Sequence, residues 1–274
     1  MQHRHSDREL YFKEQGESTK KYVLPYIKEA YEQYFELTES LQPGTRVLEV
    51  GCGEGGNLSP FLELGCESYG VELSDSNYGN ALKFYDKSRF KEHLHLYHNN
   101  IYDLTCQDLG GVFEIVFLRD VLEHIHQQEM FMEHIKQFLS PAGVLFIAFP
   151  PWRMPFGGHQ QICHNKLLCN LPYFHLLPKK IYGKILKTGG VNPQGLLEIK
   201  ETGISINRFE KIIRKRDYEV IKKTHWFINP NYQVKFGLTP RKLPKLFQIT
   251  RLQDFYVTAM YYLLKLNTQN INIK

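Results

Sequence analysis

A run of glycines directly after a short apolar segment constrains this chain more than any other feature. Residues 46–50 form a β-rich run typical of a buried strand, and four of the next six residues, 51–56, are glycines. Glycine lets a backbone turn sharply and approach a ligand without a Cβ clash. The helix expected next, at 58–64, presents free N–H groups to the same place. The pattern therefore predicts a strand–loop–helix unit whose loop binds a ligand.

Strand and helix patterns alternate along the chain after this loop. Helical patterns at 78–90 and 129–139 separate further apolar runs, and alternation of this kind predicts a parallel sheet with helices on both faces. The expected strands are 46–50, 68–73, 94–97, 113–118, 144–149, 220–226 and 257–266. The fold class is therefore α/β with a seven-stranded, mostly parallel sheet. Ligands in such sheets bind beyond the carboxyl ends of the strands.

The remaining segments frame this sheet within a single domain, 1–274. Residues 1–44 are expected to form a helical cap, which Pro25 interrupts or divides by opening a second helix. Residues 45–150 form the ligand-binding core. Residues 151–205 lose regular periodicity but are rich in prolines, glycines and aromatic residues, which favours an ordered lid after the fifth strand. Residues 206–274 supply the last helix, at 206–216, and the last strands.

Composition excludes some classes of protein. The five cysteines form no CxxC pair, which predicts reduced thiols and a cytoplasmic protein. The polar start of the chain is unlike a secretory signal, and no apolar run has the length of a membrane span. The net charge of +5 includes basic stretches at 208–223 and 241–251, where solvated surface lysines are the simpler interpretation. The chain lacks a dense basic and aromatic patch, so we expect no nucleic-acid partner.

Two acids near the glycines bear on the choice of ligand. Gly51, Gly53 and Gly56 have the spacing of dinucleotide sites, so the glycines alone leave the cofactor open. Glu49 lies at the end of the first strand, where a carboxylate suits an ammonium and a sulfonium better than a pyrophosphate. Glu72 closes the second strand, where a carboxylate can accept hydrogen bonds from both ribose hydroxyls.

These motifs resemble class I S-adenosylmethionine-dependent methyltransferases of the ubiquinone-type and small-molecule O-methyltransferase group, which have a Rossmann-like fold. The segment 49–55 (Glu-Val-Gly-Cys-Gly-Glu-Gly) is similar to that family's first motif, and 113–124 to its fourth-strand motif. Asn100 departs from the family pattern, because it stands where the family usually has Asp. The resemblance implies S-adenosylmethionine as cofactor, S-adenosylhomocysteine as product, and these cofactor-binding residues: Glu49, Gly51, Cys52, Gly53, Gly55, Glu72, Leu73, Asn100, Ile101, Asp120 and Val121.

Methyl transfer to a hydroxyl needs a base, and histidine is the usual proton acceptor near neutral pH. The candidates are His124 after the fourth strand and His159 and His164 in the lid. His159 is preferred because two glycines precede it and the acceptor should lie just beyond the fifth strand. The acceptor is expected to be a partly apolar or planar small molecule that contacts Trp152, Phe156, His164 and Tyr173. The histidine spacings do not match a helical metal site, so we expect no metal.

Three other functions remain open at this point. The same glycines suit a nicotinamide-dependent oxidoreductase, although Glu49 and the 120–124 motif argue against it. A non-catalytic methyltransferase-fold module that keeps the cofactor is compatible with Asn100 and with the lack of an unambiguous base. An RNA methyltransferase ranks below the small-molecule enzyme. The sequence leaves the acceptor and the oligomeric state undetermined.

Overall fold

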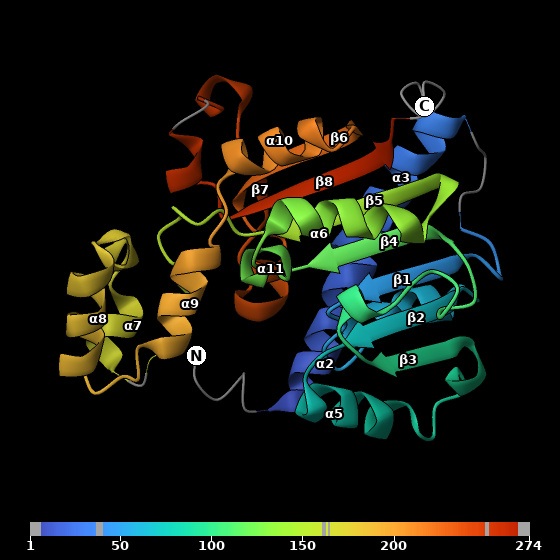
Figure 1. Ribbon diagram of the computed structural model, residues 1–274, viewed down its shortest axis with the longest axis horizontal. Coiled ribbons are helices and arrows are strands. Elements are labelled where there is room, and N and C mark those ends of the chain that lie inside the picture. The colour runs from blue at the N-terminus through green and yellow to red at the C-terminus, as the bar shows by residue number, and fades with distance from the viewer. Residues whose placement is uncertain (1–6, 37–40, 161–162, 164, 250–251, 268–274) are drawn as a thin grey trace.

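The computed structural model describes residues 7–36, 41–160, 163, 165–249 and 252–267. Its centre is one sheet with the strand order β3-β2-β1-β4-β5-β8-β6-β7 (Figure 1). Strands β1 to β5 pair in parallel, while β8 is antiparallel to both β5 and β6. The expected mostly parallel sheet is confirmed. The strands are β1 Arg46–Val50, β2 Glu67–Glu72, β3 Leu94–His98, β4 Phe113–Arg119, β5 Leu139–Phe149, β6 Tyr218–Ile228, β7 Arg241–Lys242 and β8 Ala259–Leu266.

The eighth strand, β7, is the one addition to the predicted seven. It is two residues long and pairs with the edge strand β6. A pattern of period two cannot be recognised over two residues. The addition lies at the sheet edge farthest from β3 and leaves the order of the other strands unchanged.

Helices cover both faces of the sheet, because neighbouring strand residues point to opposite sides. Leu48 belongs to the apolar core formed with α6 (Gln128–Ile135) and α10 (Ile206–Lys215). Val47, the preceding residue, belongs to the core formed with α3 (Leu24–Phe35) and α4 (Ser59–Glu63). The helix α5 (Asp75–Tyr85) begins before the predicted residue 78, because the Ser74 hydroxyl caps it by accepting from the Asn77 N–H.

The N-terminal cap is helical from α2 (Arg8–Ser18) through a π-helical turn, Thr19–Val23, into α3. Pro25 lies in the first turn of α3, directly after the π-helical turn that interrupts the regular α-helix. The chain stays helical across this point, so Pro25 marks an irregularity within the cap rather than a break between separate helices. The predicted helical cap extends to residue 44, whereas α3 ends at Phe35, and residues 37–40 lie outside the described part.

The fifth strand differs from its prediction. Residues 129–139 are predicted to be helical, and the chain is helical to residue 138, because the 3-10 turn Lys136–Phe138 continues α6. Residues 141–143 are predicted to form a turn before a strand at 144–149, but β5 already begins at Leu139. The expected turn residues lie inside the strand, because the pairing of β4 with β5 shifts register between Phe113 and Ile115. An irregularity of this kind lets extra residues bulge out of a continuous ladder.

The predicted lid after β5 contains three helices: α7 (Lys166–Asn170), α8 (Lys179–Thr188) and α9 (Gln194–Thr202). They stand beside the sheet rather than on either face (Figure 1). The segment has a small apolar core of its own, which includes Leu168, Phe174, Tyr182, Leu186 and Leu196. A further short helix, α11 (Asn231–Phe236), has no counterpart in the sequence prediction. Among the described helices, none combines the length and apolar character needed to cross a bilayer.

Candidate functional site

A cavity of about 500 Å³ opens at the carboxyl ends of β1, β2 and β4. Its size lies within the range of about 300–1,000 Å³ that is usual for small-molecule sites. Besides the strand ends, the wall includes residues of α2, the glycine loop and the 3-10 turn after it, the turn after β4, α5 and α11. The lining residues are Arg8, Tyr11, Gln15, Gly51, Gly53, Glu54, Asn57, Glu72, Leu73, Asn77, Arg119, Asp120, Val121, His124, Asn231 and Lys235. The cavity lies where the parallel topology predicts a ligand.

Two glycines of the loop are required by its geometry. Gly51 has a φ of 71°, and a Cβ there would lie 2.6 Å from Val121 Cγ2. Gly53 has a φ of 56°, but no atom lies within 4 Å of a Cβ at that position. A side chain at 53 therefore has room to project into the free space by the loop, whereas one at 51 meets the turn after β4. The main chain at residue 53 is therefore directly accessible to a ligand in the cavity.

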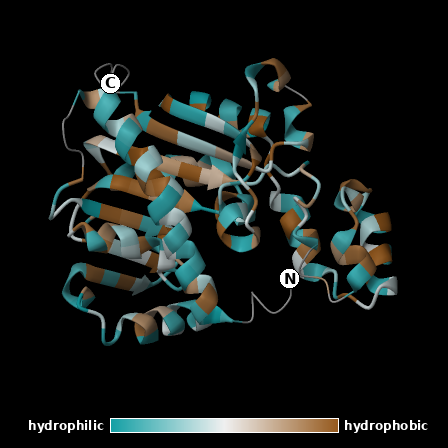
Figure 2. Cartoon of the chain, turned by 180° about the vertical axis from the view of Figure 1, so that it is seen from behind, coloured by the Kyte–Doolittle hydropathy of each residue, from teal (hydrophilic) through white to brown (hydrophobic). Residues whose placement is uncertain are grey.

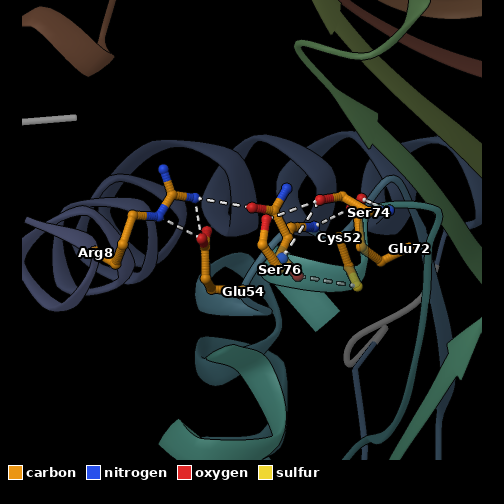
Figure 3. A network of polar contacts seen from close by, with 8 residues as sticks. Arg8, Cys52, Glu54, Glu72, Ser74 and Ser76 are labelled. Atoms are coloured by element: carbon orange, nitrogen blue, oxygen red, sulfur yellow. Dashed lines mark hydrogen bonds and ion pairs between the residues drawn. The ribbon is translucent and has the colours of Figure 1, made fainter. Parts of the chain in front are cut away.

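Glu72 is held rigidly at the end of β2. Its Oε2 accepts from the Gly53 N–H at 2.8 Å, and its Oε1 accepts from the Ser74 N–H at 2.8 Å (Figure 3). Each carboxylate oxygen has a second lone pair for another donor. Leu73 follows and also lines the cavity, with 68% of its side chain exposed. The strand end thus offers acceptors and a bare apolar surface side by side.

The N-terminal helix α2 contributes a wall that the sequence does not predict. Arg8 forms an ion pair with Glu54 of the glycine loop and donates to Asn77 Oδ1 of α5 at 3.2 Å (Figure 3). Tyr11, one turn further along α2, also lines the cavity, and burial raises its pKa. These contacts join the N-terminal cap to the glycine loop and to α5, which both contribute to the cavity wall.

A buried guanidinium forms part of the floor. Arg119, at the end of β4, donates to Ser18 Oγ at 2.7 Å, Thr19 Oγ1 at 3.0 Å and Asn57 Oδ1 at 3.1 Å. The amide of Asn57 in turn donates to Glu49 Oε1 at 2.7 Å. Glu49 is fully buried and does not line the cavity, and its burial raises the pKa of the carboxyl well above the usual range. Glu49 therefore fixes the amide of Asn57, whose oxygen accepts a hydrogen bond from Arg119.

The turn after β4 is strained. Asp120 has a φ of 56°, which is unusual for a residue with a side chain, and its N–H donates to the Ala148 carbonyl at 2.9 Å. The strain is compatible with a role in binding, because such conformations persist where the surrounding structure holds them for function. Asp120, Val121 and His124 all face the cavity from this turn.

His124 and His159 come together although they are far apart in the sequence. Their ring centroids are 5.0 Å apart, and ligand atoms of Glu123, His124 and His159 lie within 4.8 Å of one another. Burial lowers the pKa of His124 and, together with Asp120, raises the pKa of Glu123 well above the usual range. His124 lines the cavity, whereas His159, in the inserted segment, does not. His124 is therefore neutral near pH 7 and able to accept a proton.

Several predicted site residues lie elsewhere. Cys52 is buried and Ile101 nearly so, while the Asn100 side chain accepts from the Tyr102 N–H; none of these three lines the cavity, and neither does Gly55. His164 lies outside the described residues. The contacts of these residues with a ligand stay predictions.

The predicted acceptor-binding aromatic residues mainly contact the protein itself. Trp152 packs edge-on against His175 at 4.7 Å, and a Cβ on Gly203 would lie 2.5 Å from its ring. The Tyr173 hydroxyl donates to the Phe255 carbonyl, and Phe156 is half-buried. None of the three aromatic residues lines the cavity described above, so their contact with an acceptor stays a prediction.

The cavity wall contains three cations that are absent from the predicted site residues: Arg8, Arg119 and Lys235. Arg119 alone had a local signal, since a basic residue that ends a buried apolar strand is unusual. Arg8 and Lys235 lie on helices whose positions relative to the glycine loop depend on packing. No pattern within either helix distinguishes them from surface residues.

Comparison with known proteins identifies the family. The family described as "Methyltransferase domain" matches residues 22–173, more than half of the chain. The chain belongs to this family of methyltransferase domains, and the predicted class of protein, the class I methyltransferases, is confirmed.

Among curated proteins, the chain is 29% identical over 128 residues to the ubiquinone biosynthesis O-methyltransferase of Rhodopseudomonas palustris. That match covers 46% of this chain and 49% of the relative, so the chain spans about half the length of the curated relatives it matches.

Solved structures share the fold. An S-adenosylmethionine-dependent methyltransferase from Clostridium acetobutylicum has a TM-score of 0.54 at 10% identity, with 91% of each chain covered. The geranyl diphosphate C-methyltransferase of Streptomyces coelicolor has a TM-score of 0.52 at 12% identity, covering 86% of this chain and 77% of that one. At these identities the likeness establishes the fold alone.

Proposed function

We propose that this chain binds S-adenosylmethionine in the cavity and transfers its methyl group to a hydroxyl oxygen of a small-molecule acceptor, releasing S-adenosylhomocysteine. Family membership supports methyl transfer over hydride transfer to a nicotinamide, which the glycine spacing alone allowed. The choice of oxygen rests on relatives named as O-methyltransferases, which the chain matches over about half their length. The proposed acceptor is defined as a class, small molecules that carry a hydroxyl group.

The observation that carries the proposal is the pairing of the glycine loop with Glu72. The Gly53 N–H holds one oxygen of Glu72 in place, and the same glycine leaves space in front of the loop for a ligand. A fixed carboxylate at the end of the second strand suits a ribose, whose two hydroxyls are both donors. Leu73 and Val121 offer apolar surface beside it for the adenine.

When bound, the cofactor supplies a sulfonium that activates the methyl group for transfer. The chain's own part is to place the acceptor oxygen in line with the methyl group and to exclude water. His124 takes the hydroxyl proton, because partial desolvation lowers its pKa below the usual 6.5, so that the imidazole is neutral near pH 7, and because it faces the cavity. His159, the base preferred from the sequence, lies against His124 and orients its ring. The proton ends on the His124–His159 pair as the oxygen–methyl bond forms.

Calorimetric titration with S-adenosylhomocysteine tests the cofactor site. We expect measurable binding to the wild-type chain and a loss of about 1–3 kcal/mol, or about 5- to 150-fold in affinity, in Glu72→Ala. Glu92→Ala, a change to an exposed acid remote from the glycine loop in sequence, is the matched control and should bind as the wild type does. The absence of any heat or thermal shift with saturating ligand would refute the proposal.

A further inference from the structure

A long stretch near the C-terminal end of the chain contains no acidic residue. Between Glu219 and Asp254 there is no Asp or Glu, whereas seven residues are Lys or Arg. The chain as a whole has 29 acids and 34 Lys and Arg, so this separation of charge is local. A basic segment without acids presents one sign of charge to a partner.

The exposed part of this stretch also carries large apolar side chains. We define the 236–252 surface by its exposed residues: Phe236, Leu238, Arg241, Lys242, Lys245, Leu246, Phe247, Ile249 and Leu252. Leu246 has 82% of its surface exposed, and the other apolar members have between 42% and 53%. The part of the segment after β7 lies at the periphery of the molecule, beyond α10, whereas α11, which ends at Phe236, lies nearer the centre of the view (Figure 1). Figure 2 shows apolar and polar residues interleaved along the peripheral part.

The backbone of this surface is tied to the fold, so the exposure of its side chains is part of the folded structure. β7 pairs with β6, and the Leu243 N–H donates to the His225 carbonyl at 2.8 Å. The Leu243 side chain is buried in the main core. Further along, the Tyr256 hydroxyl donates to the Phe247 carbonyl. One leucine therefore anchors the segment, while its neighbours point outward.

The cations of this surface are not engaged in ion pairs within the described part of the fold, although Lys242 Nζ lies 5.8 Å from the centre of the Trp226 ring. Lys222 and Lys223, at the start of the acid-free stretch, pair with Glu29 and Glu210. By contrast, Arg241, Lys242 and Lys245 form no ion pair with any residue that the structure describes. Their charge is available to an external anion.

We propose that the 236–252 surface binds the chain peripherally to an anionic lipid bilayer. Leucine, isoleucine and phenylalanine side chains would enter the boundary between headgroups and acyl chains, while the neighbouring Lys and Arg contact lipid phosphates. A second copy of the chain suits this surface less well, because a self-complementary interface would bring like charges together. The mixture of apolar and basic side chains matches both components of an anionic bilayer.

The surface continues from the candidate site. Asn231 and Lys235 of α11 line the cavity, and Phe236 and Leu238 directly after them begin the exposed apolar set. Bilayer binding would therefore place the cavity close to the lipid. This inference stands without the proposed function, but if both are correct, an acceptor dissolved in the bilayer has a short path to the cavity.

Vesicle co-sedimentation tests the inference on the whole chain. The probes are phosphatidylcholine vesicles and vesicles of phosphatidylcholine mixed with phosphatidylglycerol. We expect binding to the mixed vesicles only, and a weakening of about fivefold for each of Arg241→Gln and Lys245→Gln. Leu246→Ser should also weaken binding. The matched controls are Lys87→Gln and Leu82→Ser, both at exposed positions on or next to α5, and these should bind as the wild type does.

Three results would overturn the inference: no sedimentation of the wild type, equal sedimentation with both vesicle types, or variants indistinguishable from their controls. Self-association through this surface, detected as a concentration-dependent mass that Leu246→Ser abolishes while vesicle binding is absent, would also overturn it. Titration of the same variants with S-adenosylhomocysteine keeps the two proposals apart. If a variant loses lipid binding but keeps normal cofactor affinity, the result tests only the proposed lipid-binding surface. If the wild type does not bind the cofactor, the result contradicts only the proposed function.

Discussion

His175 gives the sharpest prediction about stability, because it is buried as a neutral group. Its Nε2 donates to the Trp152 carbonyl at 2.8 Å, and its side chain is fully inaccessible to solvent. Burial, as the main cause, lowers its pKa to about 4 from the usual 6.5. The residue lies within the segment inserted after β5 and ties it to Trp152 at the start of that segment, so its protonation should loosen the segment first.

The sign and size of the effect follow from these two pKa values. Between pH 6.5 and 4 the unfolded chain carries a proton on this histidine that the folded chain does not, so stability falls as the pH falls through this window. From pH 7 to pH 5 the loss is about 2 kcal/mol for one such group. Buried Glu49 acts in the opposite direction, because burial raises its pKa.

A comparison of two proteins isolates the histidine from these other groups. Urea unfolding of the wild type and of His175→Gln is measured at pH 7 and pH 5, and glutamine keeps an N–H donor for Trp152. Glu49 is common to both proteins, so its contribution cancels in the difference. We expect the change in unfolding free energy between the two pH values to differ by about 2 kcal/mol between the proteins. An identical pH dependence in both would refute the neutral, buried His175.

Five further predictions concern the site. Gly53→Arg should abolish binding of S-adenosylhomocysteine, measured by calorimetry, because the new side chain would fill the free space by the loop where the ligand is proposed to bind. Unchanged affinity would show that the cofactor does not bind at this loop. His124→Ala should lower kcat by about 10²- to 10⁴-fold at unchanged cofactor affinity. Because burial lowers the pKa of His124, the acid limb of the wild-type rate profile should lie below pH 6.5; a midpoint above that value would contradict this. His159→Ala should reduce turnover while cofactor binding is spared, and an unaffected rate would dismiss its role. Turnover should survive a chelator, and loss restored by a divalent ion would contradict the expectation of a metal-free reaction at the Glu123, His124 and His159 group.

Local patterns were sufficient for most of the sheet. Strand β1 and the glycine loop could be predicted because apolar period and glycine content are properties of neighbouring residues. The proximity of Glu72 to the glycine loop followed from topology, since parallel strands bring their carboxyl ends to one edge, whereas the hydrogen bond from the Gly53 N–H to Glu72 did not. By contrast, the start of β5 at Leu139 was missed, because the register shift against β4 depends on the partner strand.

The walls of the cavity depended on packing between distant segments. Arg8 reaches Glu54 across 46 residues, and His124 meets His159 only because the inserted segment folds back over the turn after β4. The aromatic residues of that insertion were predicted to contact an acceptor, yet Trp152 is packed against His175. Aromatic composition cannot separate these two settings, since both bury flat apolar surface.

The sequence by itself determined the α/β sheet, the family and the ligand edge of the sheet, because these follow from the period of apolar residues and from glycines at fixed spacing. The tertiary structure alone decided which charges surround the cavity, which histidine faces it, and which apolar side chains stay exposed between 236 and 252. These features arise from contacts between residues far apart in the chain, and no local pattern encodes such contacts.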